Sequence, residues 1–337
     1  MRIVIFNYPD KGFLGTNPDG YYSICLEDLK KEKDVIVVNY PLDYKSSLVR
    51  FLYKAYNSFK GHFIRYTHLD GLFMDKFWYP YYFSKKQLAG QHPSCFVFIS
   101  YPQEGYLKYL RLNYPHAIHI KAIRDLASTQ KRFKYFYESG LFDYWMSFDA
   151  GDCEKYKMIP FSEFESRIEL YDTTKLKASD VFFTGRAKNR LPKLIEAYDH
   201  LTSLGQNCLF FIMGAKEIEQ VHRDGIYYID KMMSYRRMLE YSIMSKCLLD
   251  INQEGALGFT SRFLEAIIYN KKLLTDNSSV IATKFYQSNG IFYSNDIKDV
   301  SMDFFMQDAP NYNYDGEFSP VHFVEIIKKE ILHYETD

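Results

Sequence analysis

The fold is decided by a stretch that reads DINQEGALGFTSRFLEA, residues 250–266. A short apolar run at residues 246–251 predicts a buried strand, and the helical spacing of residues 260–269 predicts a helix soon after it. The loop between them contains Gly255 and Gly258, and glycine permits tight turns and a close approach of the backbone to a ligand. The stretch therefore predicts one strand–loop–helix unit of a parallel α/β sheet.

The start of this helix suits a diphosphate. Thr260 and Ser261 offer hydroxyl groups, and the first amides of a helix are unpaired donors at the positive end of its dipole. Arg262 adds a positive charge, and Glu265 is placed to accept hydrogen bonds from two ribose hydroxyls. A structural interpretation stays open, in which Thr260 only caps the helix and Glu265 is a first-turn acid that favours the dipole.

A second segment reads DVFFTGRAKNR, residues 180–190. Its predicted strand ends at Thr184 and Gly185, and three cations follow within five residues: Arg186, Lys188 and Arg190. Cations just beyond the carboxyl end of a strand suit a pyrophosphate leaving group. The alternative is a solvated basic turn without a ligand.

The rest of the chain repeats the same alternation, which is typical of parallel α/β architecture. At 337 residues the chain exceeds the usual size of one domain. Strands are predicted at residues 2–7, 34–39, 95–100, 117–120, 142–148, 180–184, 207–213, 225–229, 246–251 and 272–275. Helices are predicted at residues 21–31, 103–113, 128–139, 190–204, 234–244, 260–269 and 320–334. We expect an α/β protein with two Rossmann-like domains facing across a cleft.

The domain limits follow from this alternation. We expect an N-terminal domain at residues 1–158, with an aromatic and basic insertion at about residues 44–90. Residues 149–177 are polar with little periodicity and are expected to hold the connection. A C-terminal Rossmann-like domain follows at residues 175–318, and a C-terminal helix at residues 319–337 is expected to pack back on the N-terminal domain.

These motifs carry a family resemblance. The segments FFTGR with a following RL, QEG, and GFTSRFLEA, together with FDYWMSFDAGDCEKY at residues 142–156, resemble bacterial GT-B-fold glycosyltransferases of capsule, exopolysaccharide and lipopolysaccharide synthesis. The resemblance covers about residues 117–292. It implies a metal-independent hexosyltransferase whose C-terminal domain binds the nucleotide-sugar donor and whose N-terminal domain binds a saccharide or lipid-linked acceptor.

The resemblance also implies roles for single residues. Arg186 and Arg190 would contact the diphosphate, residues 260–262 would cradle it, Glu265 would hold the ribose, and Glu254 would face the donor sugar. Glu254 and Glu265 stand eleven positions apart, whereas the familiar retaining pattern has eight, so retention or inversion stays open. A sugar-nucleotide epimerase of the same architecture and a non-catalytic nucleotide-sugar-binding partner of another transferase are the competing interpretations.

An inverting transferase needs a base near the acceptor hydroxyl. Asp10 and Asp19 follow the first strand and Asp125 follows a later one, so these three are the candidate bases. A further candidate is His119, although a histidine within an apolar strand is usually structural. The pair Asp149 and Asp152 gives a weak hint of the metal-binding carboxylates of another transferase class.

Composition limits the other partners. Lys+Arg and Asp+Glu both total 42, which disfavours nucleic acid as a partner. No G-x-G-x-x-G follows the first strand, so a dinucleotide oxidoreductase lacks support. The five scattered cysteines predict neither disulfides nor a zinc site. With no signal peptide and no apolar run of about 20 residues, we expect a cytoplasmic protein without a resident cofactor.

Residues 44–86 contain eight Lys or Arg against two acids, interleaved with aromatic residues. Such a segment suits the inner face of a membrane, with basic groups on the headgroups and aromatic rings at the boundary. The alternative is a helical insertion that packs its aromatic rings inward and exposes its lysines.

Overall fold

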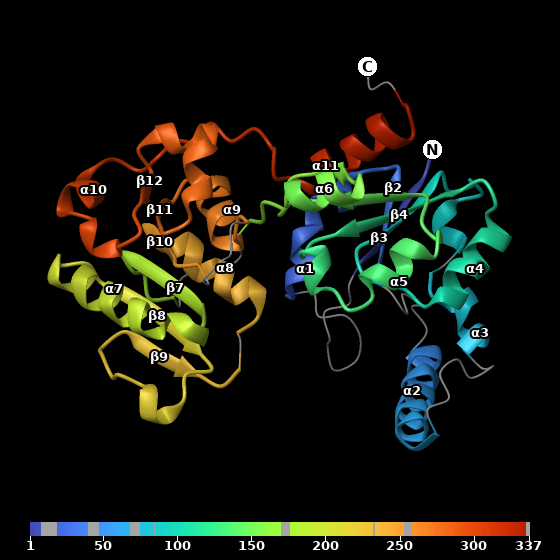
Figure 1. The fold of residues 1–337 in the computed structure, drawn as a ribbon, viewed down its shortest axis with the longest axis horizontal. Coiled ribbons are helices and arrows are strands. Elements are labelled where there is room, and N and C mark those ends of the chain that lie inside the picture. Colours follow the sequence, from blue (N-terminus) through green and yellow to red (C-terminus); the bar gives the residue numbers. More distant parts are fainter. Residues whose placement is uncertain are drawn as a thin grey trace. The chain divides into compact units, whose positions relative to one another are not determined.

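The computed structural model describes residues 1–7, 19–39, 47–67, 75–83, 85–169, 176–231, 233–252 and 258–334, without the side chains of residues 61–67 and 287. The chain forms two compact units. Unit 1 contains residues 1–163 together with 320–337, and unit 2 contains residues 164–319. Figure 1 shows each unit as a sheet with helices packed around it.

Unit 1 is built on a six-stranded sheet with the strand order β2-β1-β3-β4-β5-β6, and all its pairings are parallel. The strands are short apolar runs, as expected where both faces of a parallel sheet are covered. In chain order they are β1 (Ile3–Asn7), β2 (Val35–Asn39), β3 (Cys95–Phe98), β4 (Ile118–Ile123), β5 (Tyr144–Ser147) and β6 (Ile159–Pro160). The α-helices are α1 (Tyr21–Cys25), α2 (Ser47–Thr67), α3 (Asp75–Trp78), α4 (Glu104–Asn113), α5 (Phe133–Glu138), α6 (Ala150–Tyr156) and α11 (Pro320–Ile326).

Unit 2 repeats this plan with the order β12-β11-β10-β7-β8-β9, again with parallel pairings throughout. Its strands are β7 (Val181–Arg186), β8 (Cys208–Met213), β9 (Ile226–Ile229), β10 (Cys247–Asp250), β11 (Lys272–Thr275) and β12 (Ile291–Tyr293). Its α-helices are α7 (Leu191–Ser203), α8 (Tyr235–Met244), α9 (Ser261–Ile268) and α10 (Met302–Met306).

Both sheets contain a topological switch point. In unit 1 the chain passes from β1 outward to β2 and then crosses to β3 on the other side of β1. In unit 2 it passes from β7 outward through β8 to β9 and then crosses to β10 on the other side of β7. Ligands of open α/β sheets bind at the carboxyl ends of the strands that flank such a point. The ends of β1 and β3, and those of β7 and β10, are therefore where each unit is expected to bind.

The cores explain much of the unusual aromatic content. In unit 1, Phe6 stacks on Phe98 with ring centroids 4.5 Å apart, and Tyr82 and Tyr106 are fully buried beside them. The core of unit 2 is more aliphatic and centres on the apolar side chains of β7, β8 and β10. The buried cysteines of both sheets pack as small apolar groups, and all five cysteines are free.

The α/β class is confirmed, but some elements differ from the sequence prediction. Residues 149–177 are not only a connection, because α6 and β6 lie within them and belong to unit 1. The sequence analysis does not predict β12, because three residues are too few for a periodic signal.

α11 belongs to unit 1, where Lys328 of the following π-helical turn Ile327–Ile331 pairs with Asp34 at 2.8 Å. Among the described helices, none is both long and apolar enough to cross a membrane.

Candidate functional site

Unit 2 brings together the two segments that the sequence predicts to bind diphosphate. β10 lies next to β7, with Cys247 opposite Val181, so the loops that leave the carboxyl ends of both strands emerge side by side. Arg190 joins these ends, since its guanidinium donates to the carbonyl of Ile251 and, at 3.1 Å, to that of Arg186. The switch point of unit 2 is thus the centre of the candidate site.

Gly185 makes room for this arrangement. A Cβ atom at Gly185 would lie 2.8 Å from Nη2 of Arg190 and 3.2 Å from the ring of Phe183. The Arg190 guanidinium stands 5.4 Å from the centre of that ring, in a cation–π contact. Glycine at position 185 thus gives this side chain room to cross the end of β7.

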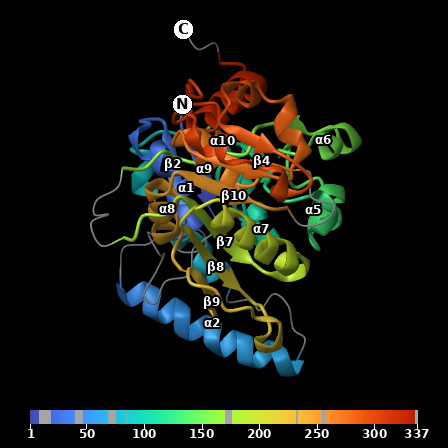
Figure 2. The same ribbon diagram turned by 90° about the vertical axis from the view of Figure 1, so that its left-hand side faces the viewer.

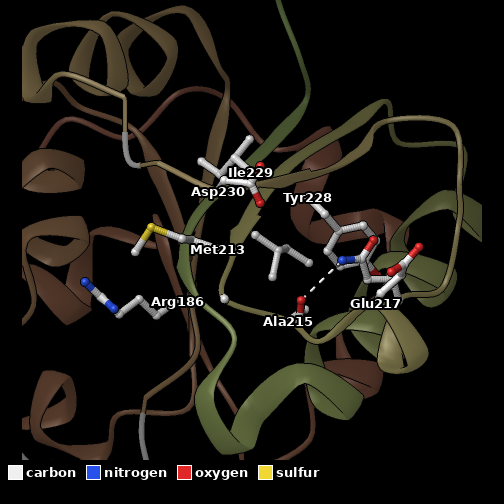
Figure 3. Close-up of a pocket in the computed structure, with 10 residues that line it drawn as sticks. Arg186, Met213, Ala215, Glu217, Tyr228, Ile229 and Asp230 are labelled. Carbon is white, nitrogen blue, oxygen red and sulfur yellow. Dashed lines mark hydrogen bonds between the residues drawn. The ribbon is translucent and has the colours of Figure 1, made fainter.

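A pocket of about 610 Å³ opens at the ends of β7, β8 and β9 (Figure 3). Arg186 lines it beside Met213, its neighbour in the β7–β8 register. Glu217 and Tyr228 line the opposite side in Figure 3, and Asp230 lies just after β9. The volume falls within the range of about 300–1,000 Å³ that is usual for small-molecule sites. One exposed guanidinium and two carboxylates therefore border a cavity of ligand size.

The three predicted cations differ in position. Arg186 is exposed and lines the pocket. Lys188 is also exposed, with a positive φ of 45°, in the turn before α7. Arg190 is half-buried on backbone carbonyls, and burial lowers its pKa. Arg186 is thus the best placed of the three to reach a ligand, and Arg190 is placed to hold the two strand ends.

The loop before α9 is partly outside the described residues, and Glu254 is among those not described. Thr260 is the N-cap of α9 and accepts a hydrogen bond from the amide of Phe263 at 3.3 Å, which is the structural role considered above. Ser261 begins the helix, and the carbonyl of Gly258 accepts from Nδ2 of Asn277 at 3.0 Å. The hydroxyl of Thr260 is thus already engaged.

Arg262 and Glu265 lie inside unit 2. Glu265 has no exposed surface, and its carboxylate lies 2.5 Å from Nη1 of Arg262, which also donates to the hydroxyl of Ser242 at 2.5 Å. α9 is buried from Arg262 to Ile268, and the side chains at positions 262 and 265 pair with each other, one turn apart. This arrangement does not support the prediction that Arg262 contacts diphosphate and Glu265 contacts ribose.

A second buried acid, Glu165, completes this cluster, and sequence reasoning missed it. The hydroxyl of Tyr235 contacts a carboxylate oxygen of Glu165 and lies 3.1 Å from Glu265. One phenol has one proton to donate, so the two carboxylates compete for it. Burial raises the pKa of Glu265, which favours a shared proton in the cluster. The position of Glu165, in a polar stretch without periodicity, carried no signal in the sequence.

Asp250, the last residue of β10, is a further buried acid. It is 3% exposed, and Thr275 on the neighbouring strand donates to its carboxylate at 3.4 Å. Burial, together with the nearby Asp276, raises the pKa of Asp250 to about 6. This carboxylate also interacts with the hydroxyl of Thr260, the N-cap of α9.

Of the three candidate bases, Asp125 lines a pocket of about 270 Å³ in unit 1, after β4. Asp19 is half-buried in the turn before α1, and Asp10 lies outside the described residues. His119 is fully buried between Phe96 and Phe98, and burial lowers its pKa to about 4. This position supports a structural role for His119.

Asp149 and Asp152, the carboxylates considered above for a metal, accept hydrogen bonds from backbone amides. Asp149 caps α6 by accepting from the amide of Asp152 at 2.8 Å, and Asp152 accepts from the amide of Ala127 at 2.7 Å. Within the part of the chain that the structure describes, no three His, Cys, Asp or Glu side chains gather as a metal site would require. The pair 149 and 152 is therefore a helix-capping pair.

Comparison with known proteins gives a likeness of fold. No protein-family model and no curated protein matches the chain. An alpha-glucosyltransferase, solved in complex with UDP-glucose and DNA containing an abasic site, is similar with a TM-score of 0.53 and 12% identity, over 98% of this chain and 100% of that chain. An alpha,alpha-trehalose-phosphate synthase (UDP-forming) from Burkholderia vietnamiensis is similar with a TM-score of 0.51 and 10% identity, over 98% and 96%. A UDP-N-acetylglucosamine 2-epimerase from Rickettsia bellii matches with a TM-score of 0.45 and 12% identity, over 99% and 100%, which is too weak to argue from.

At these identities the likeness concerns the fold alone. The chain has two Rossmann-like α/β units, as the GT-B fold does.

Proposed function

We propose that this chain is a glycosyltransferase that moves a hexose from a nucleoside-diphosphate donor on unit 2 to a saccharide or lipid-linked acceptor on unit 1. The pathway we propose is the synthesis of a surface polysaccharide such as capsule or lipopolysaccharide. One observation carries the proposal: the 610 Å³ pocket lined by Arg186 opens at the ends of β7, β8 and β9, and β7 is one of the two strands that flank the switch point of unit 2.

The chemistry needs charge stabilisation where the diphosphate departs. Arg186 supplies an exposed guanidinium, which is the side chain best suited to bind phosphate through two parallel hydrogen bonds. Arg190 acts as a positioning residue, because it holds the ends of β7 and β10 together. We propose that the nucleoside occupies the pocket between Met213, Tyr228 and Asp230, with its diphosphate toward Arg186.

Acceptor activation is proposed for Asp125, because it lines a pocket in unit 1. A carboxylate there is suited to accept the proton of an attacking hydroxyl. The proposal includes no metal, so activity is expected to persist in EDTA. Full loss in EDTA, restored by Mn²⁺ or Mg²⁺, would contradict that part of it.

The first test is nucleotide binding. We expect Arg186→Gln to weaken the binding of UDP, GDP or another nucleoside diphosphate by about 1.5–3 kcal/mol, the usual worth of hydrogen bonds to a charged group. The matched control is Lys216→Gln, since Lys216 is an exposed cation beside the pocket residues Ala215 and Glu217 but does not line the pocket. Equal affinity in both variants and the wild type, measured by calorimetry, would remove the donor site.

Two other functions predict different results in the same assay. A sugar-nucleotide epimerase would change the donor sugar without any acceptor, which chromatography of the nucleotide sugar detects. A non-catalytic partner of another transferase would bind nucleotide but transfer no sugar by itself. Asp125→Asn would then change neither property. A transferase loses sugar transfer with Asp125→Asn and keeps its nucleotide affinity.

We also propose that unit 1 contacts an anionic membrane surface through α2, the long helix at the periphery of unit 1 in Figures 1 and 2. Val49, Tyr53 and Tyr56 of this helix pack on the core of unit 1, whereas four large apolar side chains face outward. These four are Leu48, Phe51, Leu52 and Phe59, each at least 48% exposed. An exposed apolar stripe within a basic segment fits a lipid interface.

Vesicle flotation tests this contact. Wild-type protein should float with vesicles that contain phosphatidylglycerol, and Phe51→Ser with Phe59→Ser should abolish it. Leu112→Ser is the control, because Leu112 is 83% exposed on α4, outside the stripe. Equal flotation of the stripe variant and the control would contradict the proposed contact.

A further inference from the structure

The second pocket, of about 270 Å³, lies wholly within unit 1 at the carboxyl ends of β3 and β4. Ser100 and Tyr101 follow β3, Arg124 and Asp125 follow β4, and all four line it. β3 is one of the two strands that flank the switch point of this sheet. Ligand sites usually have about 300–1,000 Å³, so this pocket suits one small polar group better than a chain of sugars.

Positive charge exceeds negative charge around this pocket. Arg124 is already neutralised, because its guanidinium forms an ion pair with Glu163 and donates to the hydroxyl of Tyr21 at 2.8 Å. The remaining charges that line the pocket are those of Lys131 and Arg132 against that of Asp125. Lys131 and Arg132 are both exposed, so their positive charges are available to a ligand.

Two hydroxyl groups add uncharged donors. The Oγ atom of Ser100 and the hydroxyl of Tyr101 are buried and make no hydrogen bond to any described part of the chain. Burial raises the pKa of Tyr101, so its phenol keeps a proton to donate. Buried hydroxyls without a partner are costly, so an oxygen-rich ligand that draws these two side chains toward the pocket would relieve that cost.

A buried lysine lies beneath these groups. Nζ of Lys121 donates to the carbonyls of Ile99 and Ala122 at 2.8 and 2.6 Å, and lies 4.6 Å from the centre of the Tyr101 ring. Burial lowers the pKa of Lys121 to about 7, so a negative charge in the pocket above favours its charged form. Lys121 does not line the pocket itself, but it lies against the ring of Tyr101, which does, so its charge adds to the attraction for an anion.

We propose that this pocket binds a phosphate ester carried by the acceptor. Lys131, Arg132 and the two hydroxyls are four donors for the three terminal oxygens of a phosphate, and Asp125 stays available for a sugar hydroxyl. The acceptor class is therefore a sugar phosphate or a sugar attached to a phosphorylated carrier. The identification of this ligand as the acceptor rests on the proposed function. The phosphate site itself rests on the pocket alone.

Three probes test whether binding depends on the phosphate group: glucose 6-phosphate, glucose and glucuronate. They share a sugar ring and differ in the charged group on it. We expect glucose 6-phosphate to bind at low ionic strength, and the two others to bind at least about tenfold more weakly, because they lack the additional charge and oxygens. Binding is measured by calorimetry in an Arg186→Gln background, which removes the phosphate-binding cation of unit 2. Glucuronate binding as tight as glucose 6-phosphate would overturn the phosphate assignment in favour of a general carboxylate or phosphate site.

Variants then locate the site. Lys131→Gln with Arg132→Gln should weaken glucose 6-phosphate binding at least about tenfold, because two charged donors are lost. Tyr101→Phe removes only a hydroxyl without a described partner, so it should weaken binding without lowering the melting temperature. The control is Lys134→Gln, an 85% exposed cation on α5 that does not line the pocket.

The outcomes separate this inference from the donor proposal. If Lys131→Gln with Arg132→Gln behaves as the Lys134→Gln control does, the phosphate site is wrong, whatever unit 2 binds. If nucleoside diphosphates fail to bind the wild type but glucose 6-phosphate binding depends on Lys131 and Arg132, the donor proposal falls and the phosphate site stands.

Discussion

The two units are both built on a parallel six-stranded sheet, but they differ in strand order and in the titratable groups that they bury. In unit 2, Asp250 of β10 and Glu265 of α9 are buried, and burial raises the pKa of both. The sheet of unit 1 buries the bases His119 and Lys121, and burial lowers the pKa of both. Burial favours the neutral form, so the same physical cause gives these acids and these bases opposite responses to pH.

Both units contain a buried ion pair. In unit 2 the ion pair of Arg262 with Glu265 is buried, which places the cost of its charges in the core. In unit 1 the pair of Arg124 with Glu163 is buried at 7% and 14% exposure, whereas Arg111 and Asp143 pair nearer the surface at 37% and 36%. We therefore expect stability to depend more strongly on a buried pair than on this exposed one.

The largest effect is expected from Arg262→Met, because it leaves the carboxylate of Glu265 buried without its cation. Removing one partner of a buried pair costs about 3–5 kcal/mol of folding free energy. Arg111→Met in unit 1 is the matched control and should cost about 1 kcal/mol or less, because that pair is exposed to solvent. Urea unfolding followed by circular dichroism measures both. Equal losses of folding free energy in the two variants would contradict the expectation that breaking the buried pair costs more.

The next effect concerns acid. Folded unit 1 keeps His119 neutral down to a pH of about 4, whereas the unfolded chain protonates it near 6.5. The unfolded state thus binds more protons in this window, so unit 1 loses up to about 3 kcal/mol as pH falls from 6.5 to 4. His119→Leu should remove this loss. Tryptophan fluorescence reports on unit 1 alone, since Trp78 and Trp145 both belong to it. An unchanged pH profile in the variant would show that other groups cause the acid sensitivity.

In unit 2, Asp250 should make stability change with pH in the opposite direction. Its pKa is about 6 in the folded state and 3.8 as the ordinary value, so the folded state binds more protons between these limits. Stability therefore falls as pH rises from 3.8 to 6, by up to about 3 kcal/mol, and stays lowered above 6. Asp250→Asn should abolish that slope. Hydrogen exchange of the amides of Leu248 and Leu249 measures it within β10. A wild-type slope of the opposite sign would contradict the burial argument.

The smallest effect is expected from Gly185→Ala. The new Cβ atom would press on Nη2 of Arg190, but the end of a flexible side chain can move, so we expect a loss of about 1 kcal/mol. Nucleotide affinity should fall a few-fold as the ends of β7 and β10 loosen. Gly140→Ala is the contrasting variant, because position 140 has a φ of 63° and open space around it. It should cost a similar amount through backbone strain alone and leave nucleotide affinity unchanged.

Much of the architecture was predictable from the sequence, because strand runs and helix periods are local. The strands β1, β7, β8 and β11 lie within one or two residues of their predicted limits. The prediction was weaker where the local signal is short or mixed. The sequence places α6 within the expected connection at residues 149–177, although its N-cap Asp149 and the amide of Asp152 form a recognisable capping pair. In α2, tyrosines face the core and leucines and phenylalanines face outward, which is the reverse of what hydrophobicity alone indicates.

The sequence by itself determined that two βα segments, at residues 180–190 and 250–266, belong to one parallel α/β domain. It also determined which side chains were available at their loops. Only the tertiary structure decided how those side chains are used. Arg186 lines a cavity, Arg190 binds the carbonyl of Ile251, and Glu265 is buried against Arg262 and Tyr235. The physical reason is that a residue's type and spacing are local, whereas its burial depends on strands brought together from distant parts of the chain.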